Sequence, residues 1–276
     1  MYIFFALLAV LLVICAGFVA SSSVFAWYEQ ANRQPLLMTE RFTLKRLWFA
    51  LRFMALETAC LCVTVLLHPL GWLRPWKRNV NREAVPVLLL HGLFHNRACW
   101  LWLRLRLMLL GVRSLHSINL PPWKDVESLT ERVAKKVDEL RLASGATKVH
   151  LVGHSMGGII ARNYLQIRGG AQKVDRCVLI ASPNSGSRLA ALALSPLATT
   201  LMPGSELLQR LAAAPIPASA RVCAIYSRHD NIVLPPESAH LTGAENIELT
   251  GLGHTTLLYH PRILQTLFSV LAGKTP

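Results

Sequence analysis

The feature that most constrains the fold of this 276-residue chain is a serine held between two glycines at the junction of two patterns. The run KVHLVG (148–153) is short and apolar, as in a buried strand, whereas SMGGIIARNYLQIR (155–168) has helical spacing. A direct connection between them requires a sharp turn at Ser155, and Gly153 and Gly157 carry no side chain that would collide with neighbouring backbone. The pattern predicts a nucleophile elbow, a strained strand–turn–helix unit that raises the Ser155 hydroxyl above the edge of a sheet.

The segments that surround this motif alternate between strand-like and helix-like patterns. Short apolar runs are separated by longer segments, of which 127–145 is amphipathic and closes with Gly145. Such alternation predicts an α/β fold, with a mostly parallel sheet and helices on both of its faces. The candidate strands are 85–92, 112–120, 148–153, 176–182, 220–227 and 246–251, and the candidate helices are 96–111, 127–145, 155–168 and 261–273.

One long connection breaks this alternation. Residues 183–219 are punctuated by prolines and rich in Ala and Leu. A connection of this length between regular elements is usually functional. We therefore expect a lid-like insertion near 183–219.

A serine nucleophile needs a base, and the base needs an acid that orients it. Asp230 follows a candidate strand and His254 lies in a glycine-rich loop, so both fall where strand ends should bring them toward Ser155. Asp230 could instead serve only as a turn residue, and His260 is a rival base. His229 is expected on the surface. The glycines that flank His254 predict an exposed, mobile loop tip.

The tetrahedral intermediate of acyl transfer needs two amide donors for its oxyanion. The residue after the nucleophile, Met156, is the first candidate. The second should follow the first strand, where His91 and Gly92 end the strand and leave the amide of Leu93, or also that of Phe94, to face the pocket. A simple strand-ending turn at the same place is the alternative.

Two apolar runs lie at the N-terminus. Residues 2–20 carry no charge and are long enough to span a bilayer, and no basic residue precedes them, which favours a retained anchor over a cleaved signal. Residues 53–73 are apolar apart from Glu57 and His68, and a lone Glu near one end can snorkel to the interface. A helical hairpin that crosses the membrane twice is one reading, and an amphipathic helix lying on the surface is the other.

The net charge of +14 and a hydrophobic content of 53% point to a membrane partner and not to nucleic acid. The arginines are scattered and no nucleic-acid motif is present. Both apolar runs have basic flanks, so the positive-inside rule gives no clear orientation, while the uncharged N-terminal tip favours an outside N-terminus. The flanking basic residues are Arg33, Arg41, Lys45, Arg46, Arg74, Lys77, Arg78 and Arg82, and the tryptophans suited to the interface are Trp48, Trp72 and Trp76.

The six cysteines show no paired spacing, so the sequence predicts neither a zinc site nor a disulfide framework. They are expected to be small buried hydrophobic residues. The triad chemistry needs no cofactor and no metal. The sequence shows no paired acidic loop that could hold calcium.

From about residue 85 to its C-terminus the chain resembles the α/β-hydrolase family, in its bacterial lipase and esterase branch. The stretches HGLF, GHSMGG, DNIVLP and GLGH carry the resemblance, and SPNSGS and LMPGSELLQRL add to it. The resemblance implies Ser155, Asp230 and His254 as the triad and Leu93 and Met156 as oxyanion donors. It implies a catalytic domain over 84–276. The N-terminal region, 1–83, is outside the usual lipase pattern and is expected to anchor the chain in a membrane.

The expected function is hydrolysis of carboxylic esters, on a lipid or small acyl-ester substrate, through an acyl-enzyme. An acyltransferase or thioesterase could use the same triad, because partition of the acyl-enzyme depends on the dryness of the pocket. A protein without catalytic activity that binds lipid or a partner is the alternative of another class. The expected location is a bacterial inner membrane, and with two spans the catalytic domain would lie outside the cytoplasm. The oligomeric state is left open.

Overall fold

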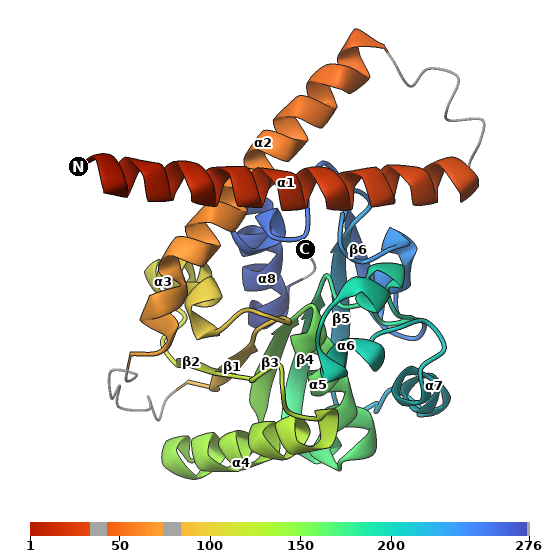
Figure 1. The fold of residues 1–276 in the computed structure, drawn as a ribbon. Coiled ribbons are helices and arrows are strands. Elements are labelled where there is room, and N and C mark those ends of the chain that lie inside the picture. Colours follow the sequence, from red (N-terminus) through yellow and green to blue (C-terminus); the bar gives the residue numbers. More distant parts are fainter. Residues whose placement is uncertain (34–42, 74–83, 275–276) are drawn as a thin grey trace.

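The computed structural model describes residues 1–33, 43–73 and 84–274, so the predictions for Arg41, Arg74, Trp76, Lys77, Arg78 and Arg82 lie outside the described residues. The described chain contains a six-stranded sheet in the order β2-β1-β3-β4-β5-β6, and each neighbouring pair is parallel. The predicted α/β fold is therefore confirmed (Figure 1). The strands are β1 (Val87–Leu90), β2 (Leu115–Ile118), β3 (Val149–His154), β4 (Val174–Ile180), β5 (Arg221–Ser227) and β6 (Glu245–Leu249).

Helices cover both faces of the sheet. Successive residues of a strand point to opposite faces, so each buried strand contributes side chains to the core on both sides. In β3, Leu151 belongs to the buried cluster beneath α4 and α5, whereas Val152 belongs to the cluster beneath α3 and α8. The helix α4 ends as predicted, with Gly145 in the left-handed conformation at φ 74°. The helices of this region are α3 (Leu101–Leu109), α4 (Val126–Ser144), α5 (Met156–Arg162) and α8 (Pro261–Ala272).

The connection 183–219 folds into short helices that pack on the α5 side of the sheet. Leu197 and Leu211 are buried in the core cluster of that face, whereas Leu194 is 98% exposed. The buried side chain of Arg162 holds the connection against α5, because its guanidinium donates to Asn184 and to the carbonyl oxygen of Leu211. The short helices are η6 (Arg188–Leu192), α6 (Pro196–Thr199) and α7 (Glu206–Ala213).

The two N-terminal apolar runs form α1 (Tyr2–Arg33) and α2 (Leu44–Leu67), which we call the helical pair. In Figure 1, α1 lies across one end of the region 84–274 and α2 crosses it. Both helices are long and apolar enough to cross a membrane by length and composition alone. Most of their surface is exposed.

The buried residues of the helical pair include polar ones that face the rest of the chain. Glu57 is 2% exposed and bonds to the loop after β6, so it does not snorkel toward an interface as the sequence suggested. On α1, the Ser22 hydroxyl accepts from Asn231 and Glu29 pairs with Arg188 at 2.7 Å. The helical pair is thus bound to the region 84–274 by specific polar contacts.

Candidate active site

Ser155 lies in the turn between β3 and α5 with φ 54° and ψ −125°, a conformation that costs energy for any residue except glycine. Its amide donates to the carbonyl oxygen of Ile180 on β4 at 2.8 Å, which fixes the turn against the sheet. A methyl group at Gly153 would lie 2.5 Å from the Cα of Gly158, and one at Gly157 would strike the carbonyl oxygen of Leu90. The strained strand–turn–helix unit therefore has the geometry that the sequence predicted.

The loop after β1 lies directly beside this turn. A methyl group at Gly92 would be 3.0 Å from the Cβ of Ser155. The side chain of His91 organises the loop, because its Nε2 accepts from the Leu120 amide at 2.7 Å and its Nδ1–H consequently donates to the Gly92 carbonyl oxygen at 2.8 Å. Burial lowers the pKa of His91 to about 4, so the ring is neutral and keeps this tautomer.

The orientation of two backbone amides follows from this geometry. In a planar trans peptide the N–H points opposite to the C=O, so the bond from His91 to Gly92 turns the Leu93 amide away from His91. Met156 is the first residue of α5, where an amide has no partner within its own helix. Leu93 thus follows the glycine that lies against the Ser155 turn, and Met156 follows Ser155 directly.

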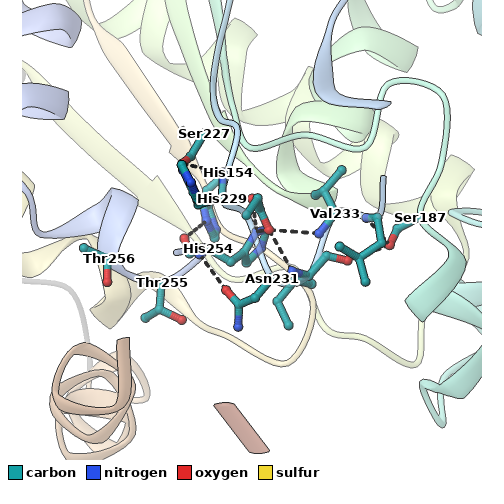
Figure 2. A network of polar contacts seen from close by, with 12 residues as sticks. His154, Ser187, Ser227, His229, Asn231, Val233, His254, Thr255 and Thr256 are labelled. Carbon is teal, nitrogen blue, oxygen red and sulfur yellow. Dashed lines mark hydrogen bonds and ion pairs between the residues drawn. The ribbon is translucent and has the colours of Figure 1, made fainter. Parts of the chain in front are cut away.

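Asp230 lies in the loop after β5 and is 1% exposed. Its Oδ1 accepts from the amides of Ile232 and Val233 at 2.8 and 2.9 Å, as a turn-forming aspartate would. The carboxylate also accepts from Nδ1 of His254, at 3.1 Å on Oδ1 and 2.9 Å on Oδ2. Figure 2 labels His254 and its neighbours Asn231, Thr255 and Thr256. The turn role and the contact with the histidine therefore coexist in one side chain.

His254 lies in the loop after β6 and is 5% exposed, so the expected exposed and mobile tip is wrong. The glycines beside it allow close approach by other segments and do not give it freedom. Its amide donates to Asn231 Oδ1 at 3.1 Å, and its carbonyl oxygen accepts from His154 Nε2–H at 3.2 Å. Burial opposes a charge on this ring, but attraction to Asp230, the hydrogen bond to Asp230 and the charge of Glu57 together raise the pKa of His254.

The His154 contact joins the Ser155 turn to the loop of His254. His154 is the residue immediately before Ser155, and its ring centroid lies 4.6 Å from that of His254. Burial holds the pKa of His154 well below its usual range, so this ring donates as a neutral imidazole. The structure thus brings Asp230 and His254 into contact and sets the His254 loop against the residue that precedes Ser155.

His229 and His260, the other two histidines considered from the sequence, have hydrogen-bond partners of their own. His229 is partly buried and does not lie free on the surface: its Nδ1 accepts from the Gly251 amide at 3.0 Å and its ring centroid is 4.9 Å from that of Phe49. His260 caps the N-terminus of α8 by accepting from the Arg262 amide at 3.2 Å. Among the described residues, the only histidine ring hydrogen-bonded to the Asp230 carboxylate is that of His254.

Three residues near this site, Asn231, His154 and Glu57, were not assigned to it from the sequence. Asn231 follows the predicted acid and His154 precedes the predicted nucleophile, so adjacency to those residues was an available signal. Glu57 gave a weaker signal, as a carboxylate inside an apolar run, which was interpreted as a snorkelling side chain. Its partner in the fold could not be read from the local pattern.

The cysteines and possible metal ligands stand apart from this chemistry. All six cysteines are free, and five are buried, which confirms the predicted role for those five. Cys62 is partly exposed. Among the described residues, no group of three or more His, Cys, Asp or Glu side chains is arranged to hold a metal ion.

A sequence model of the alpha/beta hydrolase family matches residues 87–245, which is more than half of the chain. The match includes β1, the Ser155 turn and Asp230, and it ends before His254.

Solved structures share the fold. The crystal structure of the mature form of Bacillus licheniformis lipase BlEst2 has a TM-score of 0.62 at 18% identity, covering 71% of this chain and 95% of that one. Aspergillus fumigatus lipase B has a TM-score of 0.63 at 22% identity, covering 72% and 55%. The Paleococcus ferrophilus monoacylglycerol lipase has a TM-score of 0.54 at 17% identity, covering 70% and 97%. At these identities the likeness concerns the fold.

Proposed function

The chain belongs to the alpha/beta hydrolase family, and on that premise we propose that it is a serine hydrolase that cleaves carboxylic esters. The observation that carries the proposal is the buried bond from His254 Nδ1 to Asp230, formed at the same sheet edge as the strained Ser155 turn. A base bound to an acid through Nδ1 has its Nε2 available for the nucleophile's proton.

The proposed reaction proceeds through an acyl-enzyme. His254 Nε2 takes the proton of the Ser155 hydroxyl as its oxygen attacks the ester carbonyl carbon, and the Leu93 and Met156 amides donate to the oxyanion. Collapse of the intermediate breaks the ester bond, and His254 gives the proton to the leaving alcohol. Water then attacks the acyl-enzyme with His254 again as base, which releases the acid and restores Ser155. Asp230 stabilises the imidazolium in both halves.

We propose a lipid or acyl ester as the substrate. The support is indirect: the structurally similar proteins include lipases, and the helical pair presents large apolar side chains to its surroundings. On α1 the side chains of Phe4, Leu7 and Val13 are more than half exposed, and on α2 Trp48 is as well. A bilayer is the solvent that suits such a surface.

The docked position of α2 bears on how the chain would meet a membrane. Glu57 and Thr64 are bonded to the region 84–274, and Phe49 lies against His229. The stretch from Leu44 to Leu56 has thirteen residues and spans roughly 20 Å, against about 30 Å for a hydrocarbon core. This favours α2 at the membrane surface over α2 as a complete span while it is docked.

The test uses the detergent-solubilised full chain with a fluorophosphonate probe and p-nitrophenyl esters of increasing acyl length. We expect covalent labelling and ester hydrolysis in the wild type, and loss of both in Ser155→Ala by about 10⁴-fold or more in rate. Product analysis with a competing alcohol distinguishes hydrolysis from acyl transfer by the same triad, and an acyl-thioester series tests for a thioesterase. A folded wild type that the probe does not label would favour a protein that only binds lipid or a partner.

A further inference from the structure

The loop that carries His254 is held by a carboxylate from the helical pair. Glu57 Oε1 accepts from the Thr255 amide at 2.7 Å, and Oε2 accepts from the Thr256 amide at 2.9 Å and from the Thr256 hydroxyl at 2.6 Å. Three donors from two consecutive residues therefore converge on one buried side chain. Hydrogen bonds to a charged acceptor are stronger than those between neutral groups, so this contact fixes the loop firmly.

Glu57 also touches the residue on the other side of the histidine. A methyl group built on Gly253 would meet the Glu57 carboxylate, and its three nearest neighbours are all atoms of that side chain. The Glu57 carboxylate thus contacts both chain neighbours of His254. It lies against Gly253 and accepts from the Thr255 amide. The glycine is needed because the carboxylate of α2 occupies the space where a side chain would be.

We propose that Glu57 is a positioning residue for His254, so that α2 completes the active site and does not merely anchor the chain. This inference rests on the proposed function, because it assigns a role in the same triad. Among the described residues, the hydrogen bonds of the His254 backbone itself come from Asn231 and His154. The amides of the next two residues, Thr255 and Thr256, donate to Glu57.

Other contacts join the same loop to the helical pair. Thr64, two turns after Glu57 on α2, bonds to the Tyr259 hydroxyl at 2.8 Å. Asn231, which accepts from the His254 amide, donates in turn to Ser22 on α1 at 2.7 Å. Both helices of the pair therefore support the His254 loop, α2 through Thr255 and Thr256 and α1 through Asn231.

The charge of Glu57 gives the inference a measurable signature. The titratable groups that face His254 are Asp230 after β5, Glu57 on α2, and His154 and His95, whose rings burial keeps neutral. Only the two carboxylates favour the imidazolium. Removal of the Glu57 charge should consequently lower the pKa of His254, whereas a purely structural contact would leave it unchanged.

Glu57→Gln keeps the shape of the side chain but loses the charge and turns an amide NH₂ toward backbone donors. We expect the rate of fluorophosphonate labelling of the full chain to fall at least tenfold, and kcat for a p-nitrophenyl ester to fall with little change in KM. The acid limb of the pH profile should move to lower pH. Glu57→Asp retains the charge on a shorter side chain, so its rate should fall while its acid limb stays near that of the wild type.

Glu29→Gln is the matched control, because Glu29 is the buried carboxylate of α1 and pairs with Arg188 away from His254. We expect it to label at the wild-type rate with an unchanged acid limb. If Glu57→Gln fails to fold, Thr256→Val removes only the hydroxyl that bonds to Glu57, and its labelling rate should fall several-fold.

The outcomes separate the two proposals. A wild type that does not label overturns the proposed function. A wild type that labels through Ser155, with Glu57→Gln at the same rate and the same acid limb, overturns the role of Glu57 and leaves the hydrolase intact. A Thr256→Val variant that labels at the wild-type rate, in the case where Glu57→Gln does not fold, also overturns it.

Discussion

The two sides of the candidate active site are built in different ways. On the nucleophile side, Gly92 follows β1, Ser155 follows β3 and Gly157 lies in the first turn of α5, and backbone packed against backbone fixes the geometry. On the base side, His254 is held by side chains from α2, from the end of β3 and from the loop after β5. The nucleophile side depends on glycines, whose lack of a Cβ lets backbone segments approach closely. The base side depends on side chains from segments distant in sequence.

The same contrast appears in two histidines. His91 on the nucleophile side is neutral because burial lowers its pKa to about 4, and it works by holding a peptide plane. On the base side the pKa of His254 is raised, because two carboxylates outweigh the effect of burial. The neutral His91 and the candidate base His254 thus differ by the charges around them, not by their depth.

The largest loss of activity should come from a substitution on the base side. Asp230→Asn replaces the acceptor of the His254 Nδ1–H with a side chain that can donate, which stabilises the wrong tautomer and should lower kcat about 10⁴-fold. Ester hydrolysis measures the effect, and thermal unfolding checks that the variant folds. Glu131→Gln, an exposed carboxylate on α4, should retain full activity. An Asp230→Asn enzyme within tenfold of the wild type would mean that Asp230 does not orient the base.

The second-largest loss of activity should come from a substitution on the nucleophile side. Gly157→Ala places a methyl group against the Leu90 carbonyl oxygen, so β1 and the Ser155 turn must move apart. We expect a loss of about 2 kcal/mol in the free energy of unfolding and a fall of about 100-fold in fluorophosphonate labelling. Denaturant unfolding and labelling kinetics measure the two.

The matched control for that substitution is Gly169→Ala, where φ is 74° but the space around the methyl group is open. It should cost about 1 kcal/mol in stability, from backbone strain alone, and leave labelling unchanged. Equal losses of labelling in the two variants would show that the close approach at Gly157 has no special role in the site.

The smallest effect separates the two histidines by pH. A protonated His254 cannot accept the Ser155 proton, so kcat/KM should rise with pH through an apparent pKa above the ordinary value of 6.5. His91→Gln should lower the plateau about tenfold, through a misoriented Leu93 amide, and leave the midpoint of the acid limb in place. A shifted midpoint would mean that His91 takes part in the titration.

The same variant has a consequence for stability. The folded state keeps His91 neutral down to about pH 4, whereas the unfolded chain binds a proton below about 6.5. Stability from this group is therefore present above pH 6.5 and lost as the pH falls toward 4. His91→Gln should flatten that part of the unfolding curve against pH.

Much of the fold, the Ser155 turn and the position of Asp230 were predictable from local patterns. The strand before Ser155 and the helix after it show their periodicity within about twenty residues, and Gly153 and Gly157 mark the turn between them. Asp230 was predictable because it follows a strand directly. The burial of His254 was not, since nothing in GLGHTT tells that a helix nearly two hundred residues earlier covers it.

The sequence by itself predicted the parallel α/β sheet and the strained Ser155 turn, and it placed the candidate nucleophile, acid and base in that order along the chain. The individual strands, helices and the turn depend on residues close in sequence, where spacing and residue type limit the backbone to few conformations. Only the tertiary structure decided that Glu57 bonds to the amides beside His254, that His154 bridges the two sides, and that α2 lies against the site. Those contacts join residues 100 to 199 positions apart, and their partners are selected by packing of the whole fold and not by any local pattern.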